Sequence, residues 1–208
     1  MAATAIVEEA AAANRWVMAH CHAADGVRNA VRAGVRSIDH GSFLDEDAVA
    51  LMVERGTWLV PTLLAARGVI AAAEGGMQLP PGVLDKARDA ASRAADSMRM
   101  AVAAGVPVAM GTDCPVSPHG TNLQELQLMS DAGLGPAGAL RAATLEAARL
   151  MQLDDELGTF APGKRGDLVV VSGDLADYAG RVEQVWKDGV LVSRGASGVH
   201  LAGAHSKG

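Results

Sequence analysis

The sequence predicts an α/β fold of parallel strands alternating with helices, followed by a small separate antiparallel β element. Short apolar runs alternate with helical patterns up to Leu153, as parallel strands joined by right-handed crossovers require. Beyond Leu153 the chain is turn-rich and then carries three short strand-like runs with a hairpin signal at Asp188-Gly189. The 208 residues are enough for one domain with a core and a small appendage.

The first part of the chain supplies three predicted strands and the helices between them. The predicted order is helix 4–14, strand 15–20, helix 24–33, strand 35–39, helix 44–55 and strand 58–62. Gly34 stands where a helix C-cap glycine belongs, and Asp45 to Asp47 place negative charge in a first helical turn, where the helix dipole favours it. Pro61 has to lie at the end of its strand because it cannot donate to a ladder.

The second part completes the α/β pattern and then changes character. The predicted order is a helix to about residue 73, a loop at 75–82, a helix at 83–104, a strand at 106–110, helices at 121–132 and 136–151, and strands at 168–171, 182–187 and 190–192. We therefore expect an α/β unit at 1–153 and a β segment at 154–193. The remainder, 194–208, is rich in Gly, Ala, Ser and His, and we expect it to be disordered.

Composition excludes several classes of partner. The net charge of −6 and the lack of a basic run argue against nucleic acid. No apolar stretch reaches the roughly 18 residues that a membrane span needs, and the acidic, Ala-rich start indicates a helix, not a signal peptide. Two cysteines give no disulfide framework, which suits a reducing compartment, so we expect a cytoplasmic protein.

Three short apolar runs each end in a residue that can bind a metal: His20, His40 and Asp113. The carboxyl ends of parallel strands meet at one edge of a sheet, where α/β enzymes build their sites. Imidazole and carboxylate ligands suit zinc, manganese, iron or nickel. A bound divalent ion lowers the pKa of a water toward about 7, and Asp113 could then also act catalytically by moving a proton.

Each of these residues also has a structural interpretation. A lone histidine at a strand end is more often a hydrogen-bonded structural residue, and Asp113 could be a turn or N-cap residue. His22 could be a second ligand if the strand continued, because it would share the face of His20; if the strand has ended, His22 is a loop residue near the substrate. His119, in a glycine-containing loop, could face a substrate carbonyl or carboxylate, or be a polar loop residue. Cys21 and Cys114 follow predicted ligands, but small packing residues are the favoured interpretation.

Six segments in a fixed order carry a family resemblance. They are 17–22, 33–41, 60–62, 111–113, 118–122 and 158–170. With these segments the chain resembles the C-terminal portion of an amidohydrolase-superfamily enzyme, close to the imidazolonepropionase-like and Xaa-Pro dipeptidase-type members. The resemblance covers residues 4 to about 192. It implies a partial (β/α)8 TIM-like barrel, strands 5–8 with their helices, followed by a fragment of a small β-sandwich.

The resemblance also implies roles for individual residues. His20 corresponds to the metal ligand on barrel strand 5, His40 to that on strand 6, and Asp113 to the aspartate of strand 8. The implied activity is hydrolysis of a C–N bond in a small amide, cyclic amide or dipeptide by metal-activated water. The implied cofactor is a divalent metal, zinc first, with manganese or iron as alternatives.

The family's strand 1 His-x-His pair and strand 4 carboxylated lysine have no counterpart in this sequence. Four strands do not close a barrel, so we expect one of three situations. The chain is a truncated or fragment form, or it assembles with a separate N-terminal half or with itself as a homo-oligomer. The third alternative is a non-catalytic half-barrel that serves as a binding or assembly module.

Overall fold

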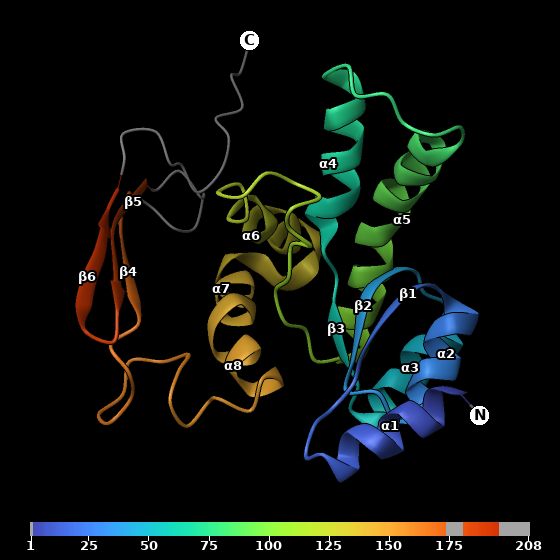
Figure 1. Ribbon diagram of the computed structural model, residues 1–208, viewed down its shortest axis with the longest axis horizontal. Helices are drawn as coiled ribbons and strands as arrows, with labels where there is room; N and C mark the ends of the chain where they lie inside the picture. The colour runs from blue at the N-terminus through green and yellow to red at the C-terminus, as the bar shows by residue number, and fades with distance from the viewer. Residues whose placement is uncertain (1, 174–180, 196–208) are drawn as a thin grey trace.

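A parallel sheet with helices packed around it forms the larger part of the computed structural model, which describes residues 2–173 and 181–195 (Figure 1). The elements run in the order α1 (Ala2–Ala12), β1 (Met18–Ala23), α2 (Ala24–Ala33), β2 (Ser37–Phe43), α3 (Glu46–Arg55), β3 (Trp58–Val60), α4 (Leu63–Glu74) and α5 (Val83–Ala104). The chain continues with α6 (Gln124–Met129), a π-helical segment η1 (Ser130–Leu134), α7 (Gly135–Arg141), a second π-helical segment η2 (Ala142–Glu146) and α8 (Ala147–Leu150). The predicted alternation of helices and strands over this part is confirmed.

The parallel sheet has the order β1-β2-β3, with each strand paired to the next one along the chain. Cys21 lies opposite His40, and Asp39 lies opposite both His20 and Val60. Because the register aligns the carboxyl ends of β1 and β2, the histidines of both strands emerge at one edge of the sheet. β1 begins and ends about three residues later than the prediction, which has consequences for His22.

The predicted fourth strand, 106–110, is wrong as a full strand. It is reduced to a parallel bridge between Leu59 and Val108, in which the Leu59 N–H donates to the Pro107 carbonyl at 2.9 Å and the Ala109 N–H donates to the Leu59 carbonyl at 3.0 Å. Pro107 has no N–H to extend a ladder. The next N–H, that of Met110, donates to the Ala142 carbonyl at 3.1 Å, so the chain leaves the sheet here.

The core lies between the sheet and the helices that cover it. Helix α2 packs against β1 and β2, α5 packs against β2, and α3 packs against α2 and α5. The side chains that fill this layer share near-complete burial: Val27, Val31, Ile38, Met52, Leu59 and Met98. Asp45 caps α3 by accepting from the Ala48 N–H at 2.8 Å, as the acidic first turn indicated. Burial of this apolar layer fixes the strands that carry the site.

A second, antiparallel sheet of β4 (Leu168–Ser172), β5 (Arg181–Lys187) and β6 (Val190–Arg194) follows a turn-rich segment and lies at the left of Figure 1. Its residues Val171 and Val182 pack against the hydrophobic core. The three predicted strands are therefore present, and Asp188-Gly189 forms the turn between the last two. The predicted tail begins within β6 at Arg194, and from residue 196 on it lies outside the described residues. No helix among the described residues is both long and apolar enough to span a bilayer.

Candidate metal centre

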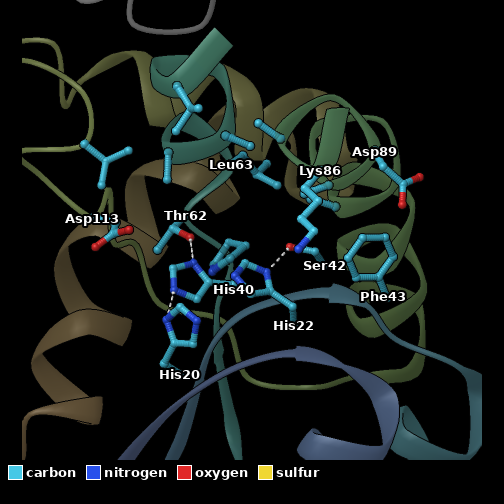
Figure 2. Close-up of a pocket in the computed structure, with 18 residues that line it drawn as sticks. His20, His22, His40, Ser42, Phe43, Thr62, Leu63, Lys86, Asp89 and Asp113 are labelled. Atoms are coloured by element: carbon cyan, nitrogen blue, oxygen red, sulfur yellow. Dashed lines mark hydrogen bonds between the residues drawn. The ribbon is translucent and has the colours of Figure 1, made fainter. Parts of the chain in front are cut away.

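Three histidines converge at the carboxyl edge of β1 and β2 (Figure 2). His20 and His22 are two residues apart in β1, so their side chains lie on the same face, and His40 projects from β2 beside them. The ring centroids are 4.4 to 4.8 Å apart, and one nitrogen from each ring lies within 4.8 Å of the others. This cluster, His20, His22 and His40, is called the histidine triad below.

Hydroxyl groups and a neighbouring ring hold the triad in place. His40 Nδ1 lies 2.6 Å from Thr62 Oγ1, and His22 Nδ1 lies 3.0 Å from Ser42 Oγ. His40 Nε2 lies 2.8 Å from His20 Nδ1, so these two nitrogens share one proton between them. A cation can take the place of that proton, because both nitrogens then offer their lone pairs to it. The donor set therefore fits a metal ion such as zinc, which three imidazoles can hold.

Burial keeps two of the three rings, His22 and His40, in their neutral, metal-binding form. Burial is the main cause that lowers the pKa of His40 to about 4, and repulsion from His22 and His20 adds to it. Burial and then His20 also lower the pKa of His22, while Asp113 opposes the shift in both. Neutral imidazole nitrogens carry the lone pairs that ligate metals. At neutral pH the site is therefore prepared to accept a cation.

Strained backbone marks the same place. Three of the six non-glycine residues with positive φ among the described residues are His40, Thr62 and Asp113, with φ angles of 75°, 47° and 55°, in the left-handed region that residues with a Cβ seldom adopt. All three line one cavity. Such conformations cost free energy and persist only where the surroundings enforce them, and they concentrate at functional sites. The strain at Thr62 and Asp113 is thus an observation beyond the histidines that marks this edge as a site.

The triad opens into a cavity of about 450 Å³ between the sheet edge and helices α4 and α5. Apolar side chains from the two helices and neighbouring segments form most of the wall: Phe43, Pro61, Leu63, Ala65, Ala66, Val69, Ala87, Ala90, Ala94 and Val116. Lys86 extends from α5 toward the triad in Figure 2, and Asp113 stands near Thr62 on the opposite side. The cavity can thus take a small, partly apolar molecule and place it beside the triad.

The predicted site residues divide into three groups. His20 and His40 come together as expected from their strand ends. Asp113 lines the same cavity but is not part of the close cluster of ligand atoms among the described residues. His119 is exposed in the turn before Gly120 and is not among the residues that line the cavity. The individual ligand, catalytic and substrate roles stay predictions.

His22 is a member of the histidine triad, whereas the loop interpretation placed it outside the strand. That interpretation assumed that the strand ended at His20, but β1 continues to Ala23. The alternative considered for a continuing strand, a second ligand on the face of His20, matches the geometry. Thr62, Ser42 and the buried Glu125 were not predicted at all. Each acts through one or two hydrogen bonds between distant segments, which leave no periodic signal in the sequence.

Comparison with known proteins places this geometry in context. The amidohydrolase family model matches residues 1–192. An ochratoxinase from Aspergillus niger is 34% identical over 196 residues, which cover 89% of this chain and 40% of that protein. An imidazolonepropionase from Rhizorhabdus wittichii is 35% identical over 150 residues, which cover 70% and 32%. The crystal structure of a Xaa-Pro dipeptidase with bound methionine superposes with a TM-score of 0.83 and 37% identity, covering 93% of this chain and 48% of that one.

The chain thus spans less than half the length of these similar proteins. The match extends across both the parallel sheet and the antiparallel sheet, because the family model ends at residue 192, within β6. The resemblance inferred from the six sequence segments, to imidazolonepropionase-like and Xaa-Pro dipeptidase-type proteins, is confirmed.

Proposed function

This chain belongs to the amidohydrolase family, and from that premise we propose that it is part of a metal-dependent hydrolase that cleaves a C–N bond in a small amide, cyclic amide or dipeptide. The observation that carries the proposal is the histidine triad at the mouth of the cavity. The names of similar proteins, an ochratoxinase and a Xaa-Pro dipeptidase, support a small amide or dipeptide as the substrate class.

We propose that His20, His40 and Asp113 ligate a divalent ion, with His22 as a further ligand or a substrate contact. All-nitrogen ligation by the triad favours zinc, and a carboxylate from Asp113 would also suit manganese or iron. When bound, the ion supplies Lewis acidity and lowers the pKa of a water. Since His40 is buried against the Thr62 hydroxyl and His22 lies against the Ser42 hydroxyl, these two rings are held in one orientation before any ligand arrives.

The chain's own residues would then bind the substrate and move the proton. The apolar walls from α4 and α5 hold the substrate and exclude water from the amide bond. Asp113 faces the same cavity and can accept a proton from the attacking water and deliver it to the leaving nitrogen. General acid–base transfer of this kind contributes typically about 10²- to 10⁴-fold to a rate.

We further propose that β1, β2, β3 and the 106–110 segment are strands 5–8 of a (β/α)8 barrel that a second polypeptide segment completes. Within the described residues, β1 pairs only with β2, so its other edge is open. On the central strand β2, the Oδ1 atom of Asp39 is buried without a hydrogen-bond partner among the described residues, and burial raises the pKa of this carboxyl. Both features support a partner, which would be a separate N-terminal half or another copy of this chain.

Metal analysis of the purified chain tests the metal centre. We expect about one equivalent of zinc after reconstitution, retained in His119→Ala, whose side chain lies away from the cavity, and lost in His20→Ala and His40→Ala. With metal bound, Asp113→Asn should abolish the hydrolysis of small amides, assayed with the chain alone and with a complementary half. A wild-type chain with a folded circular dichroism spectrum but no bound zinc, manganese or iron would contradict the proposal and favour the non-catalytic module.

A further inference from the structure

Glu125, on α6, is a carboxylate with no access to solvent, since its side chain is 0% exposed. Both of its oxygens are used within the protein. Oε1 accepts from the Leu63 N–H at 2.8 Å, and Oε2 accepts from the Leu64 N–H at 2.7 Å. These two N–H groups belong to the first turn of α4, where a helix leaves its N–H groups without partners of its own. Glu125 therefore caps α4 from a different helix, 62 residues away from Leu63.

Capping by Glu125 changes what Thr62 can do. Thr62 is the N-cap residue of α4, a position where a threonine hydroxyl normally accepts from an N–H of the first turn. Here the Thr62 side chain makes no such bond. Its hydroxyl instead lies 2.6 Å from His40 Nδ1. The exchange is possible because the N–H groups that would compete for the hydroxyl are already taken: the Leu64 N–H donates to Glu125, and the Ala65 N–H donates to the Thr62 backbone carbonyl at 3.1 Å.

Other contacts hold the same turn of α4 from a second direction. Ser117 donates its hydroxyl to the Leu64 carbonyl at 3.1 Å. Gly68 lets this loop approach, since a Cβ at Gly68 would lie 2.3 Å from Ser117 Oγ. The start of α4 is thus fixed on both sides, which is consistent with the strained φ angle of Thr62, 47°. A rigid start to the helix gives the Thr62 hydroxyl one direction, toward His40.

A buried carboxylate is a costly cap, because desolvation raises the pKa of Glu125 to about 7. The two N–H hydrogen bonds and the charge of Arg67 lower this pKa, but by less than desolvation raises it. A glutamine of the same length has only one oxygen acceptor and would present an NH₂ group to the second N–H. Only the carboxylate satisfies both groups at once. The chemistry of the cap therefore depends on the carboxylate and not merely on the volume of the side chain.

We propose that Glu125 is a positioning residue of the metal centre, which caps α4 and thereby leaves the Thr62 hydroxyl to orient His40. The relay runs from Glu125 through the Leu63 and Leu64 N–H groups to Thr62 and then to Nδ1 of His40. Fixing Nδ1 decides where Nε2, the nitrogen that faces His20, points. The inference rests on the proposed metal-binding function of the triad, but its first step can be observed without metal.

The test compares the full-length wild type with Glu125→Gln, Glu125→Ala and Thr62→Val. A matched control is Asp45→Ala, which removes the cap of α3 but does not contact Thr62 or His40. In the metal-free protein, ¹⁵N NMR of the histidine rings reports the hydrogen bond at His40 Nδ1. We expect both Glu125 variants to change the His40 signal as Thr62→Val does, and Asp45→Ala to leave it unchanged.

Zinc titration supplies the second readout. Loss of a residue that orients a ligand typically weakens metal affinity by about 10- to 100-fold, and we expect this for Glu125→Gln and for Thr62→Val. The double variant Glu125→Gln/Thr62→Val should bind no more weakly than Thr62→Val alone, because both changes break one relay. A purely structural role would instead give additive losses and a matching loss in Asp45→Ala.

The outcomes separate this inference from the proposed function. If the wild type binds no zinc, the metal centre fails, while the His40 signal still decides whether Glu125 acts through Thr62. If Glu125→Gln is folded and keeps the wild-type His40 signal, the relay is overturned, whether or not zinc binds. Should Glu125→Ala fail to fold, the comparison rests on Glu125→Gln, which keeps the side-chain volume and one acceptor.

Discussion

Each ring of the histidine triad has a partner that decides which of its nitrogens carries a proton. If Nδ1 of His40 donates to Thr62 and Nδ1 of His22 donates to Ser42, the Nε2 atom of both rings is left with a lone pair. Burial keeps His40 neutral, since it lowers the pKa to about 4. The metal-binding form is therefore determined by two hydroxyl groups and by desolvation, before any ion is present.

Substitution of two neighbouring serines, Ser42 and Ser97, should distinguish a residue that orients the metal site from one that stabilises the fold. Ser42→Ala removes the hydroxyl partner of His22, and we expect zinc affinity to fall by about 10-fold or more with little change in stability. Ser97 accepts from the Leu44 N–H and donates to the Ser42 carbonyl, both buried, so Ser97→Ala should cost about 1–3 kcal/mol of stability. Zinc titration and chemical denaturation of both variants test this. Equal losses of affinity would contradict it.

Glu125 predicts a pH dependence of stability with a defined sign. Burial raises its pKa from the usual 4.5 to about 7, so between these values the folded state binds more protons than the unfolded state. Its contribution is therefore full below about pH 4.5 and is lost as the pH rises through about 7, by on the order of 3 kcal/mol.

His40 has the opposite dependence, because its pKa is lowered, and its contribution grows as the pH rises from about 4. The comparison with Glu125→Gln cancels this term, since both proteins carry His40. We expect the stability of the wild type to fall relative to Glu125→Gln between pH 5 and pH 8 in chemical denaturation of the metal-free proteins. A difference that stays constant over this range would show that Glu125 ionises normally in the folded state.

At the level of elements, the sequence predicted the helices and the first three strands because their apolar runs pack into one core. The end of β1 was misplaced for a physical reason. Its side chains alternate only between exposed and half-buried, so the strand lacks the fully buried apolar face that would mark its length. Placing its end at His20 left His22 outside the strand. The 106–110 segment was predicted to be a full strand and forms only one bridge, because an apolar run predicts burial but not a hydrogen-bonded neighbour on each side.

The parts of the site that could not be predicted are contacts between distant segments. His20 and His40 follow from the rule that parallel strands end at one edge. Thr62 and Glu125 do not, because their roles depend on how α6 packs against the start of α4. A single buried glutamate within an otherwise ordinary helical pattern carries no signal of its partner. The relay depends on the tertiary packing of α6 against α4, which a sequence pattern does not specify.

Gly111 lets the segment that carries Asp113 pass closely over β3. A Cβ at Gly111 would lie 2.4 Å from the Cγ1 atom of Val60, so Gly111→Ala must push the segment away. We expect a loss of about 1–3 kcal/mol in the free energy of unfolding, and weaker amide hydrolysis if Asp113 moves the proton. Adding Val60→Ala should recover part of both, because it removes the clashing atom. A double variant no more stable than Gly111→Ala would refute the close approach as the cause.

At the scale of the whole molecule, the parallel sheet has an exposed edge. β1 pairs only with β2 among the described residues, and parallel strands are normally covered on both sides. Met18, the first residue of β1, is 57% exposed, and an open strand edge with apolar side chains invites pairing with another chain. The chain spans less than half the length of these similar proteins.

We therefore expect the isolated chain to self-associate through β1 as its concentration rises. Light scattering coupled to size exclusion should show a mass that increases with concentration, and Met18→Lys should shift it toward the monomer, since a charge at a strand edge opposes pairing. Met77→Lys is the matched control, because Met77 is equally exposed, at 59%, but lies in the loop between α4 and α5. A wild type that is monomeric at every concentration would exclude self-association. Equal effects of the two lysine substitutions would show that the association does not depend on the edge of β1. Addition of a complementary half should compete with self-association, because both partners use the same edge.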